Sequence, residues 1–250
     1  MAYQGYVWDD ESGTFKPVSV ELPLEAELDL HVNGEMWVRL TCFPQDLKAL
    51  ALGFLYTAGV IKTLDDLEEI YINRSQSCAD VWLKEWPWEG GRVKRSPSGC
   101  AGGVVMALDF EPPTPLMPDD TFSLAQVRQM MTILLRHNTD PNLWISGLFT
   151  QQGKLLVSMQ DLDYRNTVHK MAGHCLLKGV PLAGQVLLTS SGISAEMVIL
   201  AARLGIPVVS GKVVTTRAMA LATAWGLTTL GYGEGREIMI YTHPERLVGP

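Results

Sequence analysis

The second half of the chain alternates strand-like and helix-like stretches in a regular order, and this alternation restricts the possible folds more than any other feature. The expected helices begin near Asn166, Ser194 and Thr215, and each ends at a glycine, which favours the left-handed conformation of a helix C-terminus. The expected strands are 185–190, 206–210, 227–231 and 236–242. Strands and helices in this order require right-handed crossovers, so we expect a mixed, largely parallel sheet covered by helices.

The first half is expected to form a smaller unit that is rich in β-structure and holds one helix. Two strand-like stretches meet at the Asn33–Gly34 pair, which strongly favours a two-residue hairpin turn. A helical period follows over 45–58, and strand-like composition then returns. We therefore divide the chain into a β-rich α+β domain, 1–118, and an α/β domain, 119–250.

Composition and charge exclude several classes of protein. The 250 residues are 47% hydrophobic and 19% charged, which is typical of a globular chain with a sizeable core. The net charge of −7 argues against nucleic acid as the main partner, because phosphate groups bind to a basic surface. The uncharged stretches are shorter than the roughly 20 residues of a membrane-spanning helix, and the N-terminus has no signal-peptide pattern. We expect a cytoplasmic protein without a nucleic-acid or membrane partner.

Four cysteines are spread along the chain, and no two have the spacing of a zinc knuckle, so no metal site is expected. Cys42, Cys78 and Cys175 lie in apolar or strand-like surroundings, where a free cysteine acts as a small hydrophobic residue. Cys100 differs because it follows a basic patch and is surrounded by glycines. Nearby positive charge lowers the pKa of a thiol, and glycine leaves room for a large molecule. The alternative is an exposed cysteine without a role.

The carboxyl ends of the expected parallel strands form the edge at which α/β sheets bind ligands. Two loops there lead into helix N-termini, where backbone N–H groups and the helix dipole favour anions. Ser190, Ser191 and Gly192 lie in the first loop, and Lys212 lies in the second. These residues predict a phosphate-bearing ligand, but turn formation alone would also explain the serines and glycines.

Five stretches form an unusual combination: "LHVNGE" and "PQDLKALALGFLYTAGVI" in the first half, and "QDLDYRNTVHKMAG", "LTSSGISAEMVILAARLGIPVVSGKVVTT" and "LGYGEGREIMIYTHPERL" in the second. Together, and in this order, they resemble the FdhD/NarQ family of formate dehydrogenase accessory proteins. The resemblance implies a three-layer α/β/α domain similar to that of cytidine deaminases, with a smaller β-rich domain attached. It also implies a homodimer.

The resemblance further implies a function. Family members accept sulfur from a cysteine desulfurase as a cysteine persulfide. They pass it to the molybdenum cofactor of formate dehydrogenase, a bis(molybdopterin guanine dinucleotide). Cys100 matches the first cysteine of the family's C-x-x-C loop, and Asp161 matches an aspartate of its E-D-V-G-R-H-N stretch. The family's cofactor-binding stretch corresponds to Tyr232, Gly233, Glu234, Gly235, Arg236 and Glu237. No tightly bound cofactor is expected, and the molybdenum cofactor or a guanine nucleotide would be a passing ligand.

The chain departs from the family pattern in the loops expected at the ligand edge. Gly103 stands where the second loop cysteine would be, and Gly192 replaces an arginine. Asp163, Tyr164 and Arg165 replace a Gly-Arg-His core. Arg165 lies one position from the arginine missing from this core, so it could offset part of the lost positive charge. Trp144 stands in place of a histidine.

Several interpretations remain open. In the favoured one, Cys100 alone carries the persulfide, and Asp161 positions a catalytic group. In the second, the protein binds a molybdopterin-type dinucleotide or a client molybdoenzyme without moving sulfur. A third is a dinucleotide-binding protein unrelated to molybdenum. Asp161 could equally be a turn residue before the helix.

Overall fold

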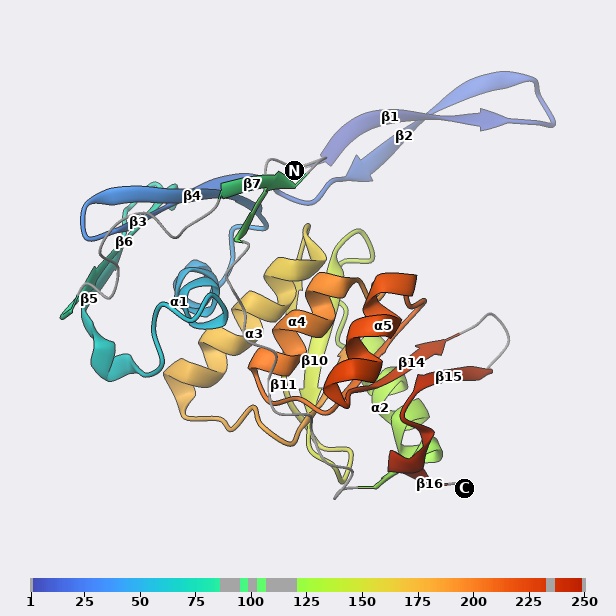
Figure 1. Cartoon of the computed structure of the whole chain (residues 1–250). Coiled ribbons are helices and arrows are strands. Elements are labelled where there is room, and N and C mark those ends of the chain that lie inside the picture. The colour runs from blue at the N-terminus through green and yellow to red at the C-terminus, as the bar shows by residue number, and fades with distance from the viewer. Residues whose placement is uncertain (1, 86–94, 99–102, 107–120, 233–236, 249–250) are drawn as a thin grey trace.

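The computed structural model describes residues 2–85, 95–98, 103–106, 121–232 and 237–248 (Figure 1). Its α-helices are α1 (Leu47–Thr57), α2 (Leu124–Arg136), α3 (Tyr164–Lys178), α4 (Ala195–Arg203) and α5 (Thr216–Trp225). Short 3-10 turns lie at Leu64–Asp66 and Pro244–Arg246. Within this part of the chain, no helix is both long and apolar enough to cross a membrane.

A six-stranded mixed sheet forms the centre of the second half, with the order β11-β10-β12-β13-β14-β15. Its strands are β10 (Trp144–Phe149), β11 (Leu155–Asp161), β12 (Val186–Thr189), β13 (Val208–Gly211), β14 (Thr228–Tyr232) and β15 (Ile238–Thr242). Only β12, β13 and β14 pair in parallel, and every other pairing is antiparallel. The sheet is mixed as expected. It is not largely parallel, because hairpin pairing adds antiparallel strands on both sides of the parallel centre.

Helices cover both faces of this sheet, which confirms the three-layer arrangement. Leu187 and Val209 belong to the core beneath α3, α4 and α5. Their neighbours Val186, Leu188 and Val208 belong to a second core beneath α2. Because successive strand residues point to opposite faces, strands that are apolar throughout must be covered on both sides.

The first half forms a four-stranded sheet with the order β4-β3-β6-β5. Its strands are β3 (Ala26–Val32), β4 (Glu35–Cys42), β5 (Leu67–Ile72) and β6 (Cys78–Leu83). β3 and β4 meet at Asn33 and Gly34, both with positive φ, as the hairpin signal predicts. One face of the sheet packs on α1, which is shorter than the expected 45–58 by two residues at its start and one at its end.

Three short two-stranded pairings lie outside these sheets. They are β1 (Ala2–Asp9) with β2 (Thr14–Glu21), β7 (Arg95–Ser98) with β8 (Gly103–Met106), and β9 (Phe122–Ser123) with β16 (Leu247–Val248). The hairpin of β1 and β2 projects away from the rest of the molecule (Figure 1). β8 contacts β4 and so places the second hairpin beside the N-terminal sheet.

The two halves meet where α1 packs against α3. A Cβ atom on Gly53 would lie 1.7 Å from the carbonyl oxygen of His169, and one on Gly173 would lie 1.9 Å from that of Ala49. The two glycines therefore let the helix backbones approach more closely than any side chain would allow. The division at residue 118 falls outside the described residues and stays a prediction.

Candidate functional site

The topology brings the predicted ligand residues to one edge of the large sheet. β12, β13 and β14 end at this edge, and Ser190, Lys212 and Tyr232 lie at or just after their ends. β10 begins and β11 ends there, because Trp144 pairs with Asp161 and Ser146 pairs with Thr189. We call this the strand-end edge. Gly233, Glu234, Gly235 and Arg236 lie outside the described residues, and Glu237 is exposed just before β15.

The loops after β12 and β13 hold each other in place. The Lys212 N–H donates to the carbonyl of Ser191 at 2.8 Å, and the Ile193 N–H donates to that of Val213 at 2.6 Å. A Cβ atom on Gly211 would lie 2.7 Å from the Ser191 carbonyl oxygen, so only glycine permits this approach. The strand-end edge is therefore a fixed backbone surface.

Helices α3, α4 and α5 start at this edge, and each start is capped by a side chain. Asp163 accepts from the Arg165 N–H, Ser194 from the Met197 N–H, and Thr215 from the Ala218 N–H. The Asp163 cap begins α3 at Tyr164, two residues before the expected start. The positive ends of three helix dipoles thus converge on one edge, which favours an anionic ligand.

Lys212 supplies a cation at the strand-end edge. Its Nζ atom lies 5.6 Å from the centre of the Trp144 ring, and both side chains are exposed. The indole face attracts the ammonium group and leaves its N–H donors available to a ligand. The sequence predicted Lys212 here but gave no sign of its contact with Trp144, because the two residues lie far apart along the chain.

Both serine hydroxyls of the loop after β12 already form hydrogen bonds within the protein. Ser190 Oγ accepts from the Ile145 N–H at 3.0 Å. Ser191 is buried, with its Oγ 3.0 Å from Thr189 Oγ1 and from the Gly192 carbonyl. Ligand contacts of this loop would therefore come from its backbone, and the binding role of Ser190, Ser191 and Gly192 stays a prediction.

Tyr232 points away from the edge. Its hydroxyl donates to the carbonyl of Val127 in α2 at 2.8 Å. Burial raises the pKa of this phenol to about 12. The side chain therefore anchors the end of β14 to α2, and a ligand at this position would meet the backbone.

Asp161 lies at the strand-end edge but is completely buried. Its Oδ2 lies 2.7 Å from Lys170 Nζ and accepts from the Phe43 N–H at 3.2 Å. Its Oδ1 accepts from the Asp163 N–H and from the Asn166 side chain, both at 3.0 Å. The carboxylate therefore links the turn before α3 to the N-terminal half. Direct contact with a substrate would require this network to open, so the geometry supports a structural role.

Arg165 does not provide a spare positive charge for a ligand. Its guanidinium contacts Asp163, with Nε 2.9 Å from Oδ1, and its Nη1 lies 3.5 Å from Glu196 Oε2. Two carboxylates therefore already neutralise it. This arrangement does not support the hypothesis that Arg165 offsets part of the positive charge lost with the arginine of the Gly-Arg-His core.

The described thiols are poorly suited to nucleophilic chemistry. Burial raises the pKa of the Cys42 and Cys175 thiols to about 12 each, as their packing role predicts. Burial, with Asp80 nearby, also raises the pKa of Cys78. Cys100 lies outside the described residues, between Ser98 and Gly103, which pair across the hairpin of β7 and β8.

Fold and site together define a layered α/β protein with an attached β-rich unit and an anion-favouring edge. The model of the FdhD/NarQ family matches residues 23–248, and the chain belongs to this family. Two relatives are both named sulfur carrier protein FdhD. The one from Shouchella clausii is 28% identical and covers 96% of this chain and 95% of its own. The one from Bacillus pumilus is 30% identical and covers 94% and 93%.

A solved structure supports the fold. The crystal structure described as that of a formate dehydrogenase accessory protein from Desulfotalea psychrophila matches with a TM-score of 0.80 and 22% identity. The match covers 99% of both chains. The arrangement of the two halves is therefore shared along the whole length.

Proposed function

We propose that this protein is a sulfur carrier for the maturation of formate dehydrogenase, with Cys100 as the persulfide-bearing residue. Family membership over residues 23–248 carries this proposal, since the curated relatives are named sulfur carrier proteins. The raised pKa values of Cys42, Cys78 and Cys175 support the choice of Cys100, because thiolate is the reactive form.

The transfer needs no outside oxidant. The Cys100 thiolate attacks the outer sulfur of a persulfide on a cysteine desulfurase. A new S–S bond forms at Cys100 while the donor's S–S bond breaks and its cysteine leaves as a thiolate. The acceptor then supplies an electron pair to the outer sulfur, a bond forms between them, the S–S bond at Cys100 breaks, and Cys100 leaves as a thiolate. One thiol suffices for this cycle, which is compatible with Gly103 in place of a second cysteine.

The acceptor in this proposal is the molybdenum cofactor, as a substrate. Its phosphates would lie at the strand-end edge, against the N-termini of α4 and α5 and beside Lys212. Lys212 is exposed, and Gly211 lets the two loops pack so closely that their backbone forms this part of the edge. The partners of the cycle are then a cysteine desulfurase and formate dehydrogenase or another molybdoenzyme, in the cytoplasm.

Mass spectrometry of the intact protein tests the carrier step. After incubation with a cysteine desulfurase and cysteine, the wild type should gain one sulfur, and the gain should disappear on reduction. Cys100→Ala should gain none, whereas Cys42→Ala should behave as the wild type. A wild type that gains no sulfur, or a Cys100→Ala variant that still gains it, would refute the proposal.

The alternative is a relative that binds the cofactor or a client enzyme without moving sulfur. The departures at Gly103 and Gly192 and the neutralised Arg165 favour it. Under this alternative, a guanine nucleotide would bind the strand-end edge while no persulfide forms on any cysteine.

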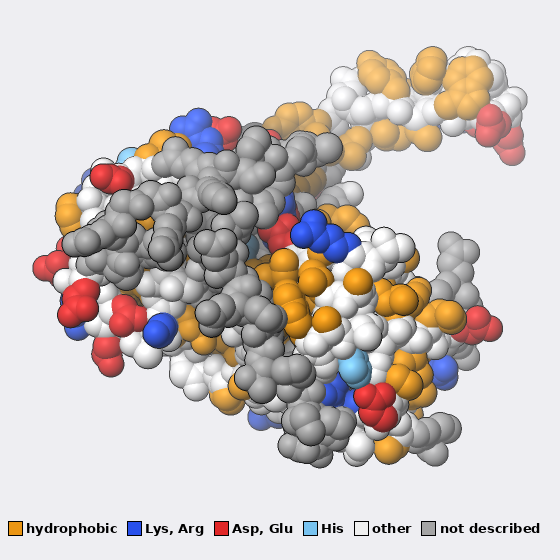
Figure 2. All heavy atoms as spheres, in the orientation of Figure 1, with side chains coloured by type: hydrophobic (Ala, Val, Ile, Leu, Met, Phe, Trp, Pro, Cys, Tyr) orange, Lys and Arg blue, Asp and Glu red, His pale blue; other side chains and the backbone are white. Residues whose placement is uncertain are grey.

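We also propose that the homodimer expected of the family forms here through the hairpin of β1 and β2. Large apolar side chains cover this hairpin (Figure 2), with Tyr6 66%, Trp8 50% and Phe15 68% exposed. Exposed apolar groups in such a cluster usually mark an interface.

Light scattering should show a dimer that becomes a monomer in the double variant Trp8→Ser/Phe15→Ser. Leu135→Ser, which alters an exposed leucine on α2, should stay dimeric. A monomeric wild type would contradict this proposal.

A further inference from the structure

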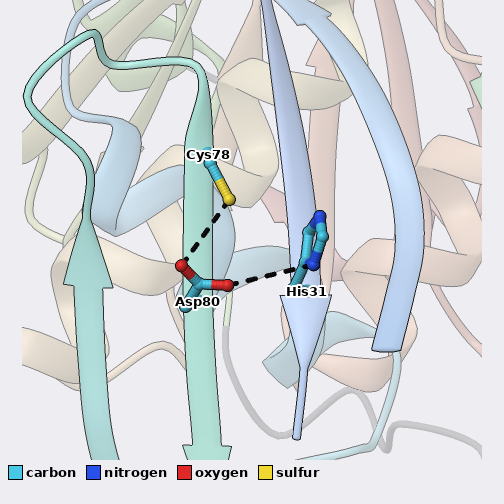
Figure 3. Close-up of side chains that lie close together, drawn as sticks. All are labelled: His31, Cys78 and Asp80. Carbon is cyan, nitrogen blue, oxygen red and sulfur yellow. Dashed lines mark hydrogen bonds and ion pairs between the residues drawn. The ribbon is translucent and has the colours of Figure 1, made fainter. Parts of the chain in front are cut away.

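A separate cluster of reactive side chains lies on the N-terminal sheet. His31 comes from β3, and Cys78 and Asp80 come from β6 (Figure 3). One donor atom from each of the three residues lies within 4.8 Å of the others. An imidazole nitrogen, a thiol sulfur and a carboxylate oxygen are the three ligand types that zinc takes in proteins.

The pairing register brings the three side chains together. β3 and β6 are parallel neighbours, with His31 opposite Asp80 and Asp29 opposite Cys78. Paired residues and residues two apart share a face of the sheet, so His31, Cys78 and Asp80 all project from one face. The sequence does not show this, because more than forty residues separate the two strands (β3 ends at 32 and β6 begins at 78).

The opposite face of the same strands is locked in the core. Leu30, Val32 and Ala79 are 0% exposed, and Val81 is 1% exposed. Because these side chains alternate with the cluster, packing under α1 fixes the backbone from which the three donor groups project. A site on rigid strands is organised before any metal arrives.

The distances suit a single small ion. Cys78 Sγ lies 3.7 Å from Asp80 Oδ2, and His31 Nδ1 lies 3.9 Å from Asp80 Oδ1. Zinc bond lengths of about 2.0–2.3 Å in a tetrahedron separate the ligand atoms by about 3.3–3.7 Å. Small side-chain rotations therefore suffice to bring one atom of each residue to a shared ion.

Asp29 lies beside the cluster but already has a partner. Its carboxylate accepts from Arg39 Nε at 2.6 Å and from Arg39 Nη2 at 2.8 Å. Among the described residues, this two-point ion pair leaves three protein ligands in the cluster, so a tetrahedral ion held by these three would keep one position for water or an external ligand. A Cys78 thiolate and the Asp80 carboxylate would together balance the charge of a divalent cation.

We propose that His31, Cys78 and Asp80 bind one Zn²⁺ ion, with the fourth coordination position open. The thiolate selects zinc over magnesium and calcium, which prefer oxygen ligands. This site does not depend on the sulfur-carrier proposal, because it uses neither Cys100 nor the strand-end edge.

Zinc titration of the full chain against a chromogenic chelator tests the proposal. The wild type should bind one equivalent. Cys78→Ser and His31→Gln should each weaken binding by about 100-fold or more, since changes in the outer shell alone cost 10–100-fold. Cobalt in place of zinc should give a near-ultraviolet band from Co²⁺–thiolate bonding, and Cys78→Ser should remove it.

Matched controls separate this site from other thiols and histidines. Cys100→Ser and His137→Gln should bind zinc as the wild type does, and the thermal melting of each metal-free variant should stay close to the wild type. Binding that is lost in Cys100→Ser but kept in Cys78→Ser would overturn the proposal. A wild type that binds no zinc would do the same.

Discussion

The carboxylate of Asp161 lies 2.7 Å from the ammonium group of Lys170, and neither side chain has any exposed surface. Both residues also bond to the backbone of Phe43, through its N–H and its carbonyl. A buried ion pair that ends β11 therefore also secures the N-terminal half against the strand-end edge. Asp161, which the sequence matches to a family position, thus holds the architecture together with Lys170.

Replacing only one member of this ion pair should destabilise the fold more than replacing both members together. Asp161→Asn and Lys170→Met should each lower the free energy of unfolding by about 3–5 kcal/mol, because each leaves a buried charge unpaired. The double variant should lose clearly less than the sum of the two. Urea unfolding measures all three, and additive losses would contradict the pairing.

The contact of α1 with α3 should tolerate no side chain at its glycines. Gly173→Ala should lower the free energy of unfolding by about 3 kcal/mol or more, because its Cβ would meet the Ala49 backbone at 1.9 Å. Gly179→Ala is the matched control in the same segment. A Cβ atom on Gly179 would meet no atom within 4 Å, so the cost comes only from its φ of +66°. We expect a loss of only about 1–2 kcal/mol in the free energy of unfolding. Equal losses in urea unfolding would refute the close packing.

His169 should make the fold sensitive to acid. Burial lowers the pKa of its imidazole from 6.5 to about 4, and its Nδ1 lies 2.8 Å from Thr57 Oγ1. As the pH falls from 6.5 to 4, the unfolded chain binds the proton first, so the free energy of unfolding should decrease by up to about 3 kcal/mol. This contribution is fully present above pH 6.5.

Comparison with His169→Gln isolates this effect from other titrating groups. The variant should lose less stability than the wild type over the same pH interval, in denaturant unfolding measured at each pH. Parallel curves for the two proteins would show that His169 does not titrate in this way.

Lys212 should strengthen guanine-nucleotide binding at the strand-end edge. Lys212→Ala should weaken GDP binding by about 10-fold or more, because a hydrogen bond to a charged group contributes about 1.5–3 kcal/mol. Lys178→Ala, at the other end of α3, should bind as the wild type does. Hydrogen exchange should show GDP protecting 190–192. Equal affinities for Lys212→Ala and the wild type would place the phosphates elsewhere.

The sequence by itself determined the alternation of strands and helices in the second half, the hairpin turn of the N-terminal sheet, and the family. Local signals sufficed for this, since Asn33 and Gly34 form a tight turn and Gly179 and Gly226 take the left-handed conformation at the ends of α3 and α5. The strand-end edge was also predictable, because strands joined by crossover helices end on the same side of a sheet.

Only the tertiary structure decided what the side chains at that edge do. The Asp161 carboxylate accepts from the Phe43 N–H, Tyr232 bonds to α2, and Arg165 is neutralised by Asp163 and by Glu196 of α4. It also brought His31 beside Cys78 and Asp80. The physical reason is the same in each case: burial, ion pairing and ligand distances depend on contacts between distant segments, whereas a sequence pattern reports only neighbours along the chain.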